Sequence, residues 1–300
     1  MASDLSELIA EDPKIERLGS GYGCAEGPIW NPDGFLLFSD IVGNTRYRWD
    51  ERDGTRAVAH PTNKANGMTL DAVGQLVVCE HTTSVVARME PGGTGTGREV
   101  VASHFGGKEL NSPNDVVVSS AGWLYFTDPT SSRQDPEMGL VRDQDLDFQG
   151  VFRVNARGGE PELLTDAFKL PNGLCFGLDE RVLYVCDTLG GYIYSHEVKS
   201  DGTLALGQLF AEGIAKIDGM KCDQAGNLWV TGPTGLWIYD PTGRRLGVVK
   251  VPGEPDPNGW GFTNLHWGGD HWGTLFVCTS NAVYRIETRT AGRREPFMTV

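Results

Sequence analysis

The chain has 300 residues, of which 40 are glycine and 39% are hydrophobic, and its formal net charge is −14. This composition is typical of a turn-rich globular protein, and an all-β chain of this length can form one domain. The acidity and the lack of a long Lys/Arg run argue against a nucleic-acid partner, because a duplex binds a basic stripe.

Residues 1–13 are polar and acidic, so we expect an N-terminal extension in front of a single domain, the whole spanning 1–300. They lack the basic and apolar regions of a secretory signal. No stretch approaches the ~18 apolar residues of a membrane span, so we expect no membrane partner. Cys79, Cys186 and Cys278 lie in apolar runs, which indicates buried free thiols and a cytoplasmic protein.

From residue 26 onward, one pattern occurs six times: a polar residue, a short apolar run, a turn rich in Asp, Asn and Gly, and a second apolar run. The leading polar residues are Glu26, Asn66, Asn114, Asn172, Asp218 and Asn264, and they lie 40 to 58 residues apart. One propeller blade takes about 40–50 residues. The runs are β-branched and aromatic without helical spacing, which favours two-stranded hairpins.

A third apolar segment follows each hairpin, for example RYRWD at 46–50 and GVFRVN at 150–155. A weaker fourth follows in most units, such as PELLTD at 161–166. The sequence therefore predicts an all-β fold, a six-bladed β-propeller with four antiparallel strands per blade. The outer strand that closes the ring lies near 15–18 or near 295–300, and the sequence does not decide between them.

In such a blade the first strand lines the central channel, and the second strand returns to the same end. The leading residues would then form one polar ring. A second ring would consist of Asp40, Glu80, Asp128, Asp187, Gly232 and Thr279. Carboxylates and amides that converge on a narrow channel predict a bound cation, and oxygen donors favour Ca²⁺ or Mg²⁺. The alternative is that these side chains cap turn backbones, which suits the second ring better than Glu26 and Asp218.

A long segment, 128–150, follows the third hairpin and leaves from the expected metal face. Loops of this length are often lids, so Arg133, Met138 and Phe148 are candidate substrate contacts. His81 follows the second hairpin at the same face and is another candidate, although a surface loop histidine is the commoner case. No GxSxG or Ser-His-Asp arrangement is visible.

The strings AEGPIW, SPNDVVVSSAGWLYFTDP, LPNGLCF and IDGMKCDQAGNLWV resemble motifs of the SMP-30/gluconolactonase/luciferin-regenerating-enzyme family, in its bacterial gluconolactonase-like branch. The resemblance implies a six-bladed propeller with one divalent metal ion, most often Ca²⁺, with Zn²⁺, Mn²⁺ or Mg²⁺ as alternatives. It implies Glu26, Asn172 and Asp218 as metal ligands, with Asn114 beside the metal or against the substrate. Animal members carry an arginine where this chain has Ser112, so their substrate preference does not transfer.

The expected activity is metal-dependent hydrolysis of a small-molecule sugar lactone. The chain would then be an enzyme that acts on carboxylic ester bonds. Asp218, the sole aspartate of the inner ring, is the candidate general base as well as a candidate ligand. Asn114, His81, Arg133 and Asp128 are the candidate substrate contacts. The alternatives are a metal-dependent hydrolase of another ester or an organophosphate, a non-catalytic binding propeller with a structural metal, and a condensing enzyme similar to strictosidine synthase.

Overall fold

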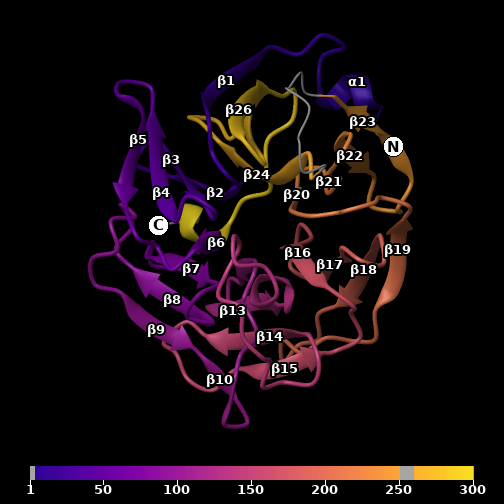
Figure 1. The fold of residues 1–300 in the computed structure, drawn as a ribbon. Coiled ribbons are helices and arrows are strands. Elements are labelled where there is room, and N and C mark those ends of the chain that lie inside the picture. The colour runs from indigo at the N-terminus through magenta and orange to yellow at the C-terminus, as the bar shows by residue number, and fades with distance from the viewer. Residues whose placement is uncertain (1–3, 251–259, 300) are drawn as a thin grey trace.

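The computed structural model describes residues 4–250 and 260–299. Six four-stranded antiparallel sheets surround a common centre, and the chain passes through them in order, as Figure 1 shows. This confirms the six-bladed propeller. Among the described residues no helix is long and apolar enough to cross a membrane.

The first three blades follow the expected hairpins closely. The first consists of β2 (Ala25–Asn31), β3 (Phe35–Asp40), β4 (Thr45–Asp50) and β5 (Gly54–Ala59). The second consists of β6 (Ala65–Leu70), β7 (Leu76–Glu80), β8 (Val85–Met89) and β9 (Glu99–Ala102). The third consists of β12 (Val116–Val118), β13 (Trp123–Asp128), β14 (Gly150–Asn155) and β15 (Glu162–Thr165). Between the second and third lies a small hairpin of β10 (His104–Phe105) and β11 (Lys108–Glu109), which the sequence pattern did not indicate.

The last three blades complete the circle. The fourth consists of β16 (Pro171–Phe176), β17 (Val182–Asp187), β18 (Tyr192–Glu197) and β19 (Gln208–Glu212). The fifth consists of β20 (Met220–Cys222), β21 (Leu228–Gly232), β22 (Gly235–Tyr239) and β23 (Arg245–Val249). The sixth consists of β24 (Phe262–Gly268), β25 (Thr274–Thr279), β26 (Ala282–Glu287) and β1 (Ile15–Ser20).

The N-terminal strand therefore closes the ring. β1 pairs antiparallel with β26, from Ile15 opposite Ile286 to Ser20 opposite Ala282. The short helix α1 (Leu5–Leu8) precedes it, and Leu8 and Ile9 are buried in the apolar cluster of the fifth and sixth blades. The expected N-terminal extension is thus packed against the propeller.

The C-terminal segment lies against the inner strands instead of forming a blade strand. Gly292 pairs with Asp223, the Arg293 amide donates to the Cys222 carbonyl, and Phe297 is buried. In Figure 1 this segment runs in yellow toward the centre and ends at the turn η2 (Pro296–Thr299). Another short 3-10 helix, η1 (Ser131–Arg133), lies in the long loop after β13.

The cysteines match their expected state. All six are free, and five are buried, including Cys79, Cys186 and Cys278. Each of these three occupies the next-to-last position of the second strand of its blade. Ser39 and Thr127 occupy the same position in other blades, which shows that this position holds a small donor side chain.

Candidate functional site

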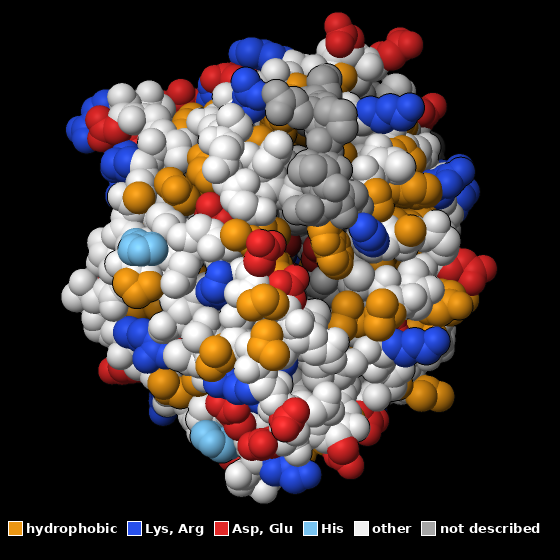
Figure 2. All heavy atoms as spheres, in the orientation of Figure 1, with side chains coloured by type: hydrophobic (Ala, Val, Ile, Leu, Met, Phe, Trp, Pro, Cys, Tyr) orange, Lys and Arg blue, Asp and Glu red, His pale blue; other side chains and the backbone are white. Residues whose placement is uncertain are grey.

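A cavity of about 390 Å³ opens at the centre of one face of the propeller. In Figure 2 acidic side chains gather beside a hollow near the centre of this face. Five of the six leading residues line the cavity: Glu26, Asn66, Asn114, Asn172 and Asp218. The predicted inner ring therefore forms, apart from Asn264, whose amide donates to Glu26 instead.

Local irregularity at the start of the inner strands turns these side chains inward. The pairing of β2 with β3 shifts register between Glu26 and Ile29, and the pairing of β16 with β17 shifts between Pro171 and Leu174. A β-bulge redirects a side chain away from the regular alternation of a strand. The leading residue can therefore face the channel while the rest of the strand packs between blades.

Glycines after the leading residues allow the inner strands to approach each other. A Cβ at Gly27 would lie 2.1 Å from the Asn66 carbonyl oxygen, and one at Gly173 would lie 2.4 Å from that of Asp218. No side chain fits at such distances. The glycines that follow Glu26, Asn172 and Asp218 are therefore needed for the close packing of the inner strands.

The carboxylates of Glu26 and Asp218 are buried, and each accepts few hydrogen bonds. Glu26 Oε2 accepts from the Gly27 amide at 2.7 Å and from Asn264 Nδ2 at 2.9 Å. Burial raises the pKa of Glu26 above its ordinary value, against the opposing effect of these two bonds. Burial, and then the negative charge of Glu26, raise the pKa of Asp218 well above its usual range, while a hydrogen bond with Asn172 opposes the shift.

This arrangement fits a hard divalent cation. Two mutually repelling carboxylates and the amide side chains of Asn172 and Asn114 line one cavity, and a cation would relieve the repulsion. The described residues contain no cluster of three or more His, Cys, Asp or Glu side chains suited to a metal. A metal here would therefore depend on amide oxygens, which suits Ca²⁺ or Mg²⁺ better than a thiolate-seeking ion.

The second predicted ring does not converge on the channel, so that expectation is corrected. Asp128 is fully buried and accepts hydrogen bonds from the amides of Asn111 and Ser112, both at 2.8 Å. Asp40 and Asp187 do the same for the loops that enter their blades. These loop amides need hydrogen-bond acceptors, so the carboxylates turn toward them and away from the channel. Asp128 is absent from the cavity lining, so we do not retain it as a substrate contact.

His81 reaches the cavity wall but is not a surface loop residue. It is only 2% exposed, and burial lowers its pKa from 6.5 to about 4. Its Nδ1 lies 2.8 Å from both the Met138 carbonyl oxygen and Ser132 Oγ, and its Nε2 lies 3.2 Å from Asn66 Nδ2. Both ring nitrogens therefore have protein partners, which leaves His81 no free polar atom for a substrate.

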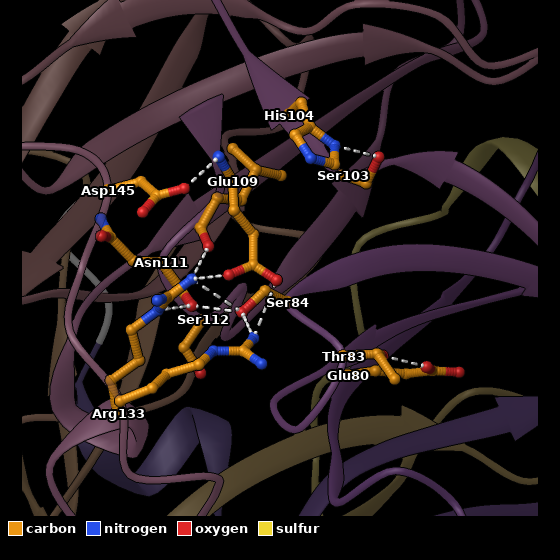
Figure 3. A network of polar contacts seen from close by, with 12 residues as sticks. Glu80, Thr83, Ser84, Ser103, His104, Glu109, Asn111, Ser112, Arg133 and Asp145 are labelled. Carbon is orange, nitrogen blue, oxygen red and sulfur yellow. Dashed lines mark hydrogen bonds and ion pairs between the residues drawn. The ribbon is translucent and has the colours of Figure 1, made fainter. Parts of the chain in front are cut away.

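Arg133 is also engaged away from the cavity. Its guanidinium is 3% exposed and does not belong to the described cavity lining. As Figure 3 shows, it points at Glu109 and at the backbone near Asn111, with an Nη2–Oε2 distance of 2.7 Å to Glu109. Phe148 packs against Phe105 and Phe152. Of the three loop candidates, only Met138 lines the cavity.

Several lining residues escaped the sequence reasoning. Ser131, Ser132, Asp135 and Glu137 come from the long loop, whose length and position could have indicated them. Trp260 also lines the cavity and is 38% exposed at its mouth, with the Lys216 ammonium 5.2 Å from its ring. No repeat position or motif marks Trp260 in the sequence.

Comparison with known proteins provides independent evidence of the family to which the chain belongs. A family model described as "SMP-30/Gluconolactonase/LRE-like region" matches residues 24–281. The gluconolactonase of Zymomonas mobilis subsp. mobilis is 31% identical over 314 residues, which cover 96% of this chain and 85% of that relative. The regucalcin of Oryctolagus cuniculus is 29% identical over 268 residues, which cover 85% of this chain and 82% of the relative.

The solved structures agree with the sequence relatives. A gluconolactonase from Xanthomonas campestris superposes with a TM-score of 0.85 at 29% identity, and the match covers 95% of this chain and 92% of that one. The family model spans all six predicted hairpins and the whole inner ring. The chain therefore belongs to the SMP-30/gluconolactonase/LRE-like family.

Proposed function

We propose that the chain is a metal-dependent hydrolase that opens sugar lactones in this cavity. The observation that carries the proposal is the pairing of two buried carboxylates, Glu26 and Asp218, with two amide side chains, Asn114 and Asn172, around one cavity. The gluconolactonase relatives support sugar lactones as the substrate class. The cavity volume of about 390 Å³ falls in the range of small-molecule sites, roughly 300–1,000 Å³.

Glu26, Asn172 and Asp218 would hold the divalent ion, with Asn114 next to it. When bound, such an ion polarises the lactone carbonyl and stabilises the negative charge that develops on its oxygen. Calcium is the ion that we expect first, because the donors are carboxylate and amide oxygens.

Asp218 is the residue that we propose as general base. Its carboxylate is 7% exposed and lies in the cavity, so it can take the proton from an attacking water. Gly173 allows the inner strand of the fourth blade to lie close against the Asp218 backbone, and this close packing would help to hold the carboxylate in place. Asn114 would orient the substrate through its amide.

A panel assay tests this proposal. Aldonolactones, a simple aryl ester and a phosphotriester would each be offered to the purified chain with Ca²⁺, with Zn²⁺ and with excess chelator. We expect ring opening of the aldonolactones with added metal and a loss of at least about 10²-fold with chelator. Hydrolysis of the phosphotriester alone would favour the organophosphatase alternative, and no turnover of any substrate with any metal would reject the proposal.

A further inference from the structure

The long loop after β13 forms one wall of the cavity. Its lining residues are Ser131, Ser132, Asp135, Glu137 and Met138. Loops without regular strands move unless side chains tie them down. How this loop is held therefore decides the shape of the cavity.

The root of the loop is anchored outside the cavity. Arg133 and Arg142 both contact the Glu109 carboxylate, at 2.7 and 3.0 Å, and the Arg142 amide donates to the Arg133 carbonyl at 3.2 Å. Figure 3 shows this network around Glu109 and Ser84. It joins the two ends of the segment 133–142 and leaves its middle, which lines the cavity, to other contacts.

His81 holds that middle part. A carbonyl oxygen can only accept, so the 2.8 Å contact with the Met138 carbonyl places the proton of the neutral imidazole on Nδ1. Nε2 is then an acceptor, and it receives the Asn66 amide at 3.2 Å. The His81 imidazole thus bonds the loop through Nδ1 and bonds Asn66, a residue of the inner ring, through Nε2.

Lys64 supplies a second contact from the same blade. Its ammonium donates to the Glu137 carbonyl at 2.6 Å and to the Val42 carbonyl at 3.3 Å. Lys64 is not part of the described cavity lining. It can therefore be changed without altering a surface that a substrate touches.

We propose that His81 is a positioning residue that fixes the loop 131–142 against Asn66 and thereby limits the cavity to lactones of a single sugar ring. The size limit rests on the cavity volume of about 390 Å³, which lies near the lower end of the range of small-molecule sites, and on the lactonase function proposed above. The positioning role rests only on the contacts of His81 and can be measured without substrate.

Two substitutions separate the two bonds of His81. In His81→Asn the amide nitrogen replaces Nδ1 as donor to Met138, and the bond with Asn66 is lost. In His81→Gln the terminal amide replaces Nε2 opposite Asn66, and the donor to the loop is lost. Lys64→Met loosens the same loop from outside the cavity and serves as a second, independent variant.

The readouts are hydrogen exchange of residues 131–142 and steady-state kinetics with glucono-1,5-lactone and a disaccharide aldonolactone. We expect His81→Gln to speed exchange about 3- to 10-fold, as the loss of one hydrogen bond predicts. KM for the monosaccharide lactone should rise by a similar factor with kcat within about 2-fold, and preference over the disaccharide lactone should fall. His81→Asn should retain exchange protection within about 2-fold, and Lys64→Met should shift exchange in the direction of His81→Gln.

Unchanged loop exchange in His81→Gln would overturn the positioning role, as would equal behaviour of the Asn and Gln variants. Unchanged size preference in a His81→Gln variant with a loosened loop would overturn the size limit. A wild-type chain without lactonase activity would instead reject the proposed function, and the exchange comparison would still decide the role of His81.

Discussion

The thiol of Cys186 donates a hydrogen bond to the backbone carbonyl oxygen of Asp218, with an Sγ–O distance of 3.2 Å. Cys186 is the next-to-last residue of the second strand of the fourth blade, and Asp218 lies just before the first strand of the fifth. Thr127 donates in the same way to the Asn172 carbonyl at 2.7 Å, and Ser39 donates to that of Asn66 at 3.1 Å. In three blades a buried donor thus holds the backbone of a ring residue in the next blade, so the ring geometry depends on residues outside the cavity.

Cys186→Ser should keep this bond, because a hydroxyl performs it at Thr127 and Ser39. We expect Cys186→Ala to lower the free energy of unfolding by about 1–2 kcal/mol, through the lost bond and the small cavity. It should also weaken Ca²⁺ affinity several-fold. Cys222→Ala, a buried thiol of the same apolar cluster, is the matched control. Denaturant unfolding and calcium titration measure both effects, and equal calcium affinity in the two alanine variants would contradict this view of the ring.

Asp218→Asn should keep the fold and lose nearly all lactonase activity. Asn is nearly isosteric with Asp, and the ring already has Asn at Asn66, Asn114 and Asn172. The variant lacks a negative charge and a proton acceptor, and loss of a general base costs about 10²–10⁴ in rate. Kinetics with excess metal separate the two causes. Recovery to the wild-type rate would mean that Asp218 acts only as a ligand, and near-normal turnover without added metal would remove it from the mechanism.

Calcium should stabilise the chain, and a chelator should reverse the effect. A ligand at 100 times its dissociation constant raises the free energy of unfolding by about 2.7 kcal/mol. Glu26→Gln should reduce this gain, because a neutral amide replaces a carboxylate that is only 4% exposed. In the metal-free state the same change should be neutral or stabilising, because it removes repulsion with Asp218. Thermal unfolding with Ca²⁺ and with chelator measures both states, and an equal calcium shift in Glu26→Gln would exclude Glu26 as a ligand.

Stability should fall as pH decreases from about 6.5 to about 4, in part because of His81. Burial lowers its pKa from 6.5 to about 4, and the nearby Lys64 charge adds to the shift, so the unfolded chain takes up a proton in this range that the folded chain does not. One pKa unit corresponds to about 1.4 kcal/mol, which gives a loss of about 3 kcal/mol at most.

His81→Gln is the control for this pH effect, because it lacks the titrating group. The stability difference between wild type and His81→Gln should therefore shrink as the pH falls from 7 to 4.5. Denaturant unfolding at both pH values measures it, and a constant difference would show that His81 does not titrate abnormally.

The sequence alone determined the six repeats, the four strands per blade and the ring residues Glu26, Asn114, Asn172 and Asp218. These features are local: each hairpin is written in contiguous residues, and a repeat places equivalent residues at equivalent positions. The sequence could not decide which terminus closes the ring, because both ends offered a candidate strand and the choice depends on pairing with β26.

Only the tertiary structure decided which polar side chains outside the inner ring reach the cavity. Asp128 and Arg133 lie in the chain beside residues that line the cavity, but neither reaches it. Asp128 accepts hydrogen bonds from loop amides, and Arg133 donates to Glu109 and to backbone carbonyls. Trp260 lies in a segment without periodicity, so no pattern could place it at the cavity wall. The position of His81 after the second hairpin indicated this face, but its hydrogen-bond partners Met138 and Asn66 appear only in the folded chain. A buried polar group takes whichever partner the packed chain presents, and neighbours distant in sequence exist only after folding.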